Sequence, residues 1–88
     1  MGRKGSILTA RLVATTTKLG YIADGMQPGL NLQVTRGVSG IVKSWVFRYT
    51  SPATRRRREM GLGPITVRSL ADAREHVAKL RLVVLNGQ

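Results

Sequence analysis

The sequence of 88 residues contains no cysteine, only four acidic residues and few aromatic ones. The absence of cysteine excludes disulfide bonds and thiolate metal sites. No segment approaches the roughly 18 consecutive apolar residues that would span a membrane. The basic N-terminal residues are not followed by an apolar stretch of the kind found in signal peptides. We therefore expect a cytoplasmic protein with no membrane partner.

The residues needed for catalysis are also scarce. One histidine, His76, lies among helix-forming residues without a partner in a metal-ligand pattern, and no Ser-His-Asp set can be assembled around it. The glycines of Gly61-Leu62-Gly63 do not lead into a phosphate-binding loop with Lys and Ser or Thr. We expect no catalytic site, no metal site and no cofactor.

Positive charge is the strongest feature that is present. Fifteen Lys and Arg residues against four Asp and Glu give a formal net charge of +11. Most of the cations are arginine, whose planar fork binds phosphates and guanine edges in a bidentate manner. The stretch from Gly25 to Arg58 contains no acidic residue. It contains these cations: Arg36, Lys43, Arg48, Arg55, Arg56, Arg57 and Arg58. A polyanion is the expected partner.

The length suits a single small domain. We expect a flexible basic leader at residues 1–7 and one domain at residues 8–88. Within the first part of that domain, Thr9 can cap a short helical turn over 10–14. Residues 21–23 are a candidate for a short edge strand that ends at Asp24-Gly25.

Three longer strands are predicted by alternation of apolar and polar residues. The first covers 30–35, and the second covers 43–50 with Trp45, Phe47 and Tyr49 on one face. The third covers 55–62. Short turns separate them, which makes consecutive strands antiparallel.

A C-terminal helix is predicted to cover the apolar face of this sheet. Ser69 to Asp72 resembles a capping box, and apolar residues then recur at helical spacing. These residues are Leu70, Ala73, Val77, Leu80 and Val84. The opposite helix face carries Arg74, Glu75, Lys79 and Arg81. The expected fold is α+β: a three-stranded antiparallel β-sheet packed against a C-terminal α-helix (β-β-β-α), with a short irregular N-terminal element.

The end of this helix leaves two interpretations open. Leu82, Val83 and Leu85 either complete the core or form a surface that meets a neighbouring domain. Asn86-Gly87 is a plausible helix stop, and a domain cut from a longer protein would end in this way.

The polar face of the sheet is the candidate DNA-binding surface, because a narrow sheet can enter the major groove. Arg can read guanine, Asn and Gln can read adenine, and Ser and Thr can bind bases or phosphates. The candidate DNA-binding residues are Asn31, Gln33, Thr35, Arg36, Lys43, Ser44, Arg48, Thr50, Arg55, Arg56, Arg57 and Arg58. Of these, Arg56 and Arg58 are expected to reach backbone phosphates. The strand aromatics are an alternative platform for single-stranded bases, although their alternation favours a place in the core.

The order of motifs resembles the N-terminal arm-type DNA-binding domain of phage- and island-encoded tyrosine integrases. The resemblance rests on Leu8-Thr9, on Ile22-Ala23-Asp24-Gly25 followed by Gly29-Leu30, and on the aromatic strand 45–49. It continues through the basic run before Leu62-Gly63 and the helix start Ser69-Leu70-Ala71-Asp72-Ala73-Arg74.

The resemblance implies binding of arm-type sites in double-stranded DNA, for integration and excision of a phage or mobile element. It implies a parent recombinase whose core-binding and catalytic domains lie outside this chain. Other integrase protomers and DNA-bending accessory proteins would be its partners, in the bacterial cytoplasm at the nucleoid.

Two other functions remain open from the residues. A small RNA-binding or ribosomal-type protein would also be basic, and it would expose its aromatic side chains. A protein-interaction module would use the basic face to bind an acidic partner, with Leu82, Val83 and Leu85 at the centre of the contact.

Overall fold

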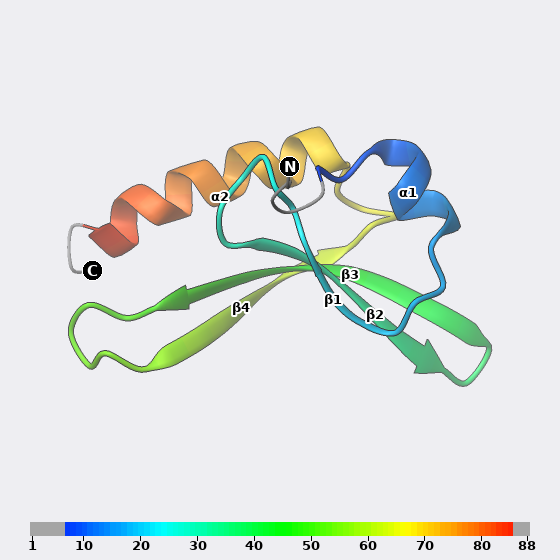
Figure 1. Cartoon of the computed structure of the whole chain (residues 1–88), viewed down its shortest axis with the longest axis horizontal. Coiled ribbons are helices and arrows are strands. Elements are labelled where there is room, and N and C mark those ends of the chain that lie inside the picture. The colour runs from blue at the N-terminus through cyan, green and yellow to red at the C-terminus, as the bar shows by residue number, and fades with distance from the viewer. Residues whose placement is uncertain (1–6, 86–88) are drawn as a thin grey trace, which may run out of the picture.

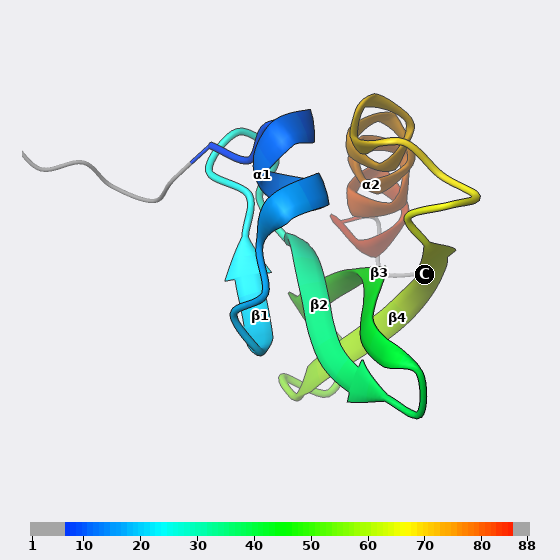
Figure 2. The ribbon, with the colours of Figure 1, turned by 90° about the vertical axis from the view of Figure 1, so that its right-hand side faces the viewer.

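The computed structural model describes residues 7–85, which form a four-stranded antiparallel sheet beneath two helices (Figure 1). The elements are α1 (Ala10–Thr15), β1 (Gly20–Ala23), β2 (Leu30–Gly37), β3 (Gly40–Thr50), β4 (Arg57–Pro64) and α2 (Leu70–Leu85). The strands lie in the order β1-β2-β3-β4, so each pairs with its neighbour in sequence. Figure 2 shows both helices on the same side of the sheet. No helix of residues 7–85 lies on the other side.

The prediction of an antiparallel α+β fold is confirmed, but the prediction of three strands and one helix is wrong. The edge strand β1 adds four residues along β2, and α1 forms a second helix. The Thr9 hydroxyl accepts the Leu12 amide proton at 3.1 Å and caps α1, as its position predicts. The helical turn over 10–14 and the candidate edge strand at 21–23 are confirmed as these two elements, although the predicted fold counted neither. Periodicity carries little information here, since a helix of 6 residues or a strand of 4 spans barely two repeats.

The covered face of the sheet contains the core. Leu30, Leu32 and Val34 of β2 lie beside Trp45 and Phe47 of β3, and all are at most 1% exposed. This is the face that the alternation predicts. The Trp45 indole donates a hydrogen bond to the carbonyl of Arg68 at 2.7 Å, so its one polar atom is satisfied inside the core.

The last strand differs from its predicted bounds. It begins at Arg57 and not at Arg55, and it runs on to Pro64. Gly61 pairs with Val46 while Gly63 pairs with Trp45, so Leu62 between them is the extra residue of a β-bulge. Gly63 has φ +102, which favours glycine. The bulge lets β4 insert Leu62 into the core.

The long helix begins as predicted, because the Ser69 hydroxyl accepts the Asp72 amide proton at 3.1 Å. Ala73 and Val77 are fully buried against the sheet. Leu82 is 63% exposed and Val83 is 43% exposed, so neither completes the core within this chain. The side chain of Leu85, the predicted stop at Asn86-Gly87 and leader residues 1–6 lie outside the described residues.

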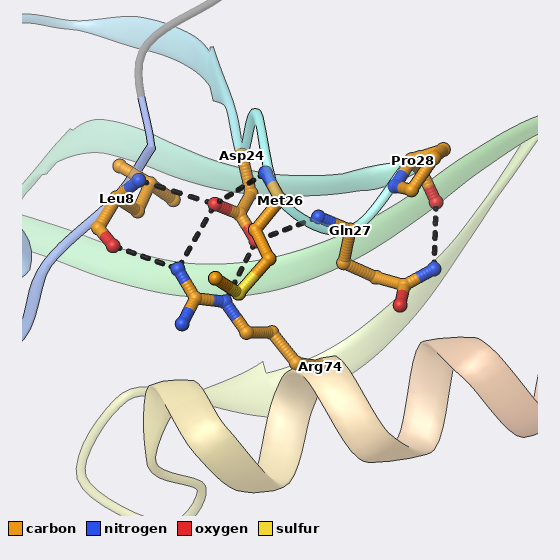
Figure 3. Close-up of polar contacts among 6 residues, drawn as sticks. All are labelled: Leu8, Asp24, Met26, Gln27, Pro28 and Arg74. Atoms are coloured by element: carbon orange, nitrogen blue, oxygen red, sulfur yellow. Dashed lines mark hydrogen bonds and ion pairs between the residues drawn. The ribbon is translucent and has the colours of Figure 1, made fainter.

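A buried ion pair ties the N-terminal segment, the β1–β2 loop and α2 together (Figure 3). The Arg74 Nε lies 2.8 Å from Asp24 Oδ2, and Arg74 Nη2 donates to the carbonyl of Leu8 at 2.7 Å. The Asp24 side chain is fully buried and also accepts backbone protons from Leu8, Met26 and Gln27. The sequence places Arg74 on the solvent face of the helix; the structure instead turns it towards Asp24.

Candidate nucleic-acid interface

The face of the sheet turned away from both helices is called the open face here (Figure 2). Strand register assigns residues to it, because directly paired residues point to the same side. Its polar side chains are those of Tyr21, Gln33, Thr35, Ser44, Arg48, Thr50, Arg57 and Glu59. The exposed Ala23 and Val42 add apolar surface to the same face. Beneath these, Asn31 and Val46 lie on the same side of the backbone but are buried.

The structure brings together seven of the twelve predicted site residues on this face. They are Asn31, Gln33, Thr35, Ser44, Arg48, Thr50 and Arg57. Arg55 and Arg56 lie in the β3–β4 loop, just before β4. The strand register places the other three, Arg36, Lys43 and Arg58, on the covered face. Arg36 and Arg58 are nevertheless exposed, because they lie near the ends of their hairpins.

A polar bridge crosses the open face from one edge strand to the other. The Tyr21 hydroxyl of β1 lies 3.1 and 3.2 Å from the two carboxylate oxygens of Glu59 on β4. Gln33 Nε2 donates to the same hydroxyl at 3.3 Å. The Arg48 guanidinium lies over the Tyr21 ring, 4.2 Å from its centroid, with Nε 3.7 Å from Glu59 Oε1. The hydrogen bond to Glu59 raises the pKa of Tyr21 above its ordinary value.

The bridge explains why Asn31 and Val46 are buried on a face that no helix covers. Tyr21 pairs with Gln33, and Glu59 pairs with Arg48, while the Asn31–Val46 pair lies in the row between them. The Tyr21 side chain must therefore extend over that row for its hydroxyl to reach Glu59. Asn31 is 8% exposed, and its amide donates to the carbonyl of Gly29 at 3.2 Å, so it is held inside the protein.

The sheet separates Lys43 from the candidates on the open face. It lies on the covered face, where its ammonium donates to the carbonyls of Val13 and Ala14 at 2.9 Å each. These are carbonyls at the C-terminal end of α1, which a helix leaves without intrahelical partners. The contact orients α1 on the sheet.

We expect Lys43→Gln to lower the free energy of unfolding by about 1 kcal/mol, because two charge-assisted hydrogen bonds are lost at a partly exposed site. Binding to nucleic acid should keep its base preference, since the side chain faces the helices. Urea denaturation and a binding assay check the two parts. Lys18→Gln, an exposed residue with no such side-chain bond among residues 7–85, is the control and should change stability by less than about 0.5 kcal/mol. A loss of base preference in Lys43→Gln would contradict this placement.

The β3–β4 loop is an ordered turn that presents a run of arginines. Two backbone hydrogen bonds close it, from the Arg55 amide to the Ser51 carbonyl at 2.7 Å and from the Ser51 amide to the Arg56 carbonyl at 2.9 Å. Arg55 adopts φ +63, a left-handed conformation that costs a non-glycine residue on the order of 1 kcal/mol. Such conformations cluster at functional sites, where the surrounding structure maintains them. Arg55, Arg56, Arg57 and Arg58 are all exposed.

The acidic residues do not compensate this run. Across residues 7–85, the ion pairs are Arg48–Glu59, Arg68–Asp72, Arg74–Asp24 and Lys79–Glu75. None involves Arg55 to Arg58, so the loop at one end of the open face retains its full positive charge. Four adjacent like charges repel one another, and binding of an anion relieves that repulsion.

Other kinds of site were sought in the part of the chain that the structure describes. Residues 7–85 contain no group of three or more His, Cys, Asp or Glu side chains placed to hold a metal ion. None of the helices found there is both long and apolar enough to cross a membrane.

Fold and surface together define a small basic α+β module with one face of its sheet free and polar. Residues 8–88 match the family model described as the Arm DNA-binding domain, and the chain belongs to that family, which is found in phage integrases. It is therefore a DNA-binding domain. Domains of this family are binding modules without catalytic activity of their own. No significant match is found among the curated proteins or among the solved structures.

Two residues of the candidate interface were not predicted from the sequence. Tyr21 and Glu59 do not belong to the predicted set, although together they hold Arg48 in place. An exposed aromatic residue in a possible edge strand, beside an alternating polar strand, was the available signal for Tyr21. For Glu59, the signal was its outward parity directly after the arginine run.

Proposed function

We propose that this domain binds double-stranded DNA sequence-specifically by inserting the open face of its sheet into the major groove. The observation that carries the proposal is the division of the sheet: both helices cover one face, and most of the side chains on the other face are polar or basic. The major groove is about 12 Å wide and admits a narrow sheet. Gln33, Ser44, Arg48 and Thr50 supply the donors and acceptors that base edges require.

The β3–β4 loop, with its run of arginines, would bind the phosphate backbone beside the groove. Phosphate contacts fix the register of a protein on the duplex, while base contacts supply specificity. The exposed Arg55, Arg56 and Arg58 have the charge for such contacts and lie at the end of the sheet. Arg36, at the tip of the β2–β3 hairpin, offers a similar contact at the opposite end.

Membership of the family supports a wider role for the parent protein. We propose that the bound DNA is the arm-type site of a phage or mobile element, and that the domain serves integration and excision within a tyrosine recombinase. Other protomers of that recombinase and DNA-bending accessory proteins would join it at the bacterial nucleoid.

The buried aromatics argue against the alternative of single-strand or RNA recognition by base stacking. Trp45 and Phe47 are each 1% exposed, and Phe47 stacks on Tyr49 with ring centroids 4.8 Å apart. A stacking platform needs exposed rings. The rings of Trp45 and Phe47 are packed inside the core and are therefore not available to stack on bases.

An NMR titration tests the proposal directly. A duplex from an integrase attachment region, a scrambled duplex and an RNA of matched sequence are added to the domain in turn. We expect shifts at residues 33–35, 44–50 and 55–59 that saturate at lower concentration with the attachment-region duplex. Shifts centred on α2, or equal salt-sensitive shifts with all three nucleic acids, would contradict sheet-in-groove binding.

We expect Arg56→Gln to weaken binding to all duplexes equally and to reduce the slope of log affinity against log salt by about 0.9, the value for one phosphate contact. The reason is that Arg56 is exposed in the loop and lies outside the strands that would enter the groove. Titration at several salt concentrations measures the slope. Lys79→Gln on α2 removes an exposed cation from the helix layer and should leave the slope unchanged. An unchanged slope in Arg56→Gln would remove this loop from the interface.

A further inference from the structure

Glu59 has an unexpected position for a surface that approaches a polyanion. Within residues 7–85 it is the one acidic side chain on the open face, and its side chain is 46% exposed. A carboxylate repels phosphate and lowers non-specific affinity for DNA. The remaining acids pair with cations of α2 or of the segment just before it, away from this face.

The carboxylate is held in a defined orientation. Both of its oxygens lie within 3.2 Å of the Tyr21 hydroxyl, which can donate only one proton. Gln33 in turn donates to that hydroxyl. A carboxylate has about four lone-pair positions, so Glu59 retains acceptor capacity towards solvent after these contacts.

Arg48 is held beside it with its donors free. The Tyr21 ring supports one face of the guanidinium at 4.2 Å, and Nε lies towards Glu59. No hydrogen bond joins its two terminal nitrogens to another residue in the described range of the chain. Holding an arginine in place in the free protein reduces the rotamer entropy that binding would otherwise cost.

Arg48 and Glu59 are direct partners in the β3–β4 register, so an arginine fork lies next to a carboxylate acceptor. A G·C base pair presents the matching pattern in the major groove: the guanine O6 and N7 acceptors lie beside the cytosine N4 amino donor. A carboxylate cannot accept from a phosphate or from the O4 of thymine, because both are acceptors.

We propose that Glu59 is a specificity-determining residue that accepts a hydrogen bond from the cytosine N4 amino group of the base pair whose guanine Arg48 binds. Tyr21 is the positioning residue for both. This inference rests on the proposed binding of duplex DNA through the open face, and it adds the identity of one base pair and the residue that discriminates it.

The test is selection of binding sites from a randomised duplex library with the whole chain, comparing wild type with Glu59→Gln. We expect wild type to enrich a G·C pair at one position. Glu59→Gln should lower the frequency of G·C there and admit some A·T, because a glutamine amide matches the N6 and N7 of adenine. The preference is weakened and not abolished, since Arg48 still selects guanine in the same pair. The variant should bind the wild-type site about tenfold more weakly. Affinity for unrelated duplex should rise, since a negative charge is removed.

Glu75→Gln is the matched control, because it removes the same charge from an exposed position on α2. It should leave the base frequencies unchanged. Tyr21→Phe keeps the ring beneath Arg48 but removes the hydroxyl that orients Glu59, and we expect it to relax the preference at the same position alone. A purely structural role for Tyr21 would not move the base preference.

The outcomes separate the two proposals. If wild type enriches no duplex sequence, the proposed function fails and this inference fails with it. If wild type enriches a site and Arg48→Ala relaxes it, but Glu59→Gln retains the same cytosine frequency, then Glu59 is only an ion-pair partner and this inference alone is overturned.

Discussion

Asp24→Asn is expected to destabilise the domain by about 3 kcal/mol, which corresponds to a fall in melting temperature of roughly 12–24 °C for a domain of this size. The Asp24 carboxylate is fully buried and accepts from Arg74 and from the backbone amides of Leu8, Met26 and Gln27. An asparagine replaces one acceptor oxygen by a donor, so it leaves buried N–H groups unpaired and the Arg74 charge uncompensated. Thermal denaturation followed by circular dichroism measures the effect.

Asp72→Asn is the matched control for this prediction. Asp72 also pairs with an arginine, Arg68 at 3.1 Å, but its side chain is 55% exposed. Exposed ion pairs contribute about 0–1 kcal/mol, so the control should lose little stability. Equal losses in the two variants would show that the buried ion pair does not hold the three segments together.

The same ion pair makes stability depend on pH in a defined direction. Burial by itself raises the pKa of Asp24, but hydrogen bonds from Arg74, Leu8 and Met26 outweigh it and bring the pKa below its ordinary value. A carboxyl group whose pKa is lower in the folded state stabilises the fold above its unfolded pKa of about 3.9 and loses that contribution as pH falls through the folded value. Wild type should therefore lose stability below about pH 4 more steeply than Asp24→Asn.

Arg48→Ala is expected to lower affinity for the specific duplex by roughly 1–3 kcal/mol, the range for a good bidentate base contact. Non-specific affinity should fall much less, since only one of many cations is removed. The physical reason is that Arg48 lies on the inner strand β3, supported by Tyr21 and Glu59, and that no hydrogen bond within residues 7–85 engages its terminal nitrogens. Fluorescence anisotropy with specific and scrambled duplexes measures both affinities.

Arg11→Ala provides the comparison for Arg48→Ala. Arg11 is an exposed arginine on α1, in the helix layer on the opposite side of the sheet. Its replacement should reduce both affinities slightly and equally. If Arg48→Ala behaves in the same way as Arg11→Ala, then β3 does not read bases.

Those parts of the fold that depend on local patterns were predictable. Alternation placed Leu30, Leu32 and Val34 on the same face as Trp45 and Phe47, and the structure buries all of them. The Thr9 and Ser69 caps begin their helices as expected. Family membership also agrees with the order of motifs in the sequence. These features extend over a few residues and follow from backbone geometry and the separation of apolar from polar side chains.

Only the tertiary structure decided which polar side chains remain available on the open face. Tyr21 and Glu59 are 38 residues apart, and Asp24 and Arg74 are 50 apart, so no local period connects either pair. The Tyr21 side chain reaches Glu59 across the Asn31–Val46 row, and Lys43 bonds to α1. Both contacts arise because the sheet sets residues of different strands in register and the two helices lie on one side of it. The sequence by itself determined the charge, the strand faces and the class of partner. Long-range packing decided which residues can contact that partner. Whether a polar side chain forms contacts within the protein or stays available depends on residues that lie far away along the chain.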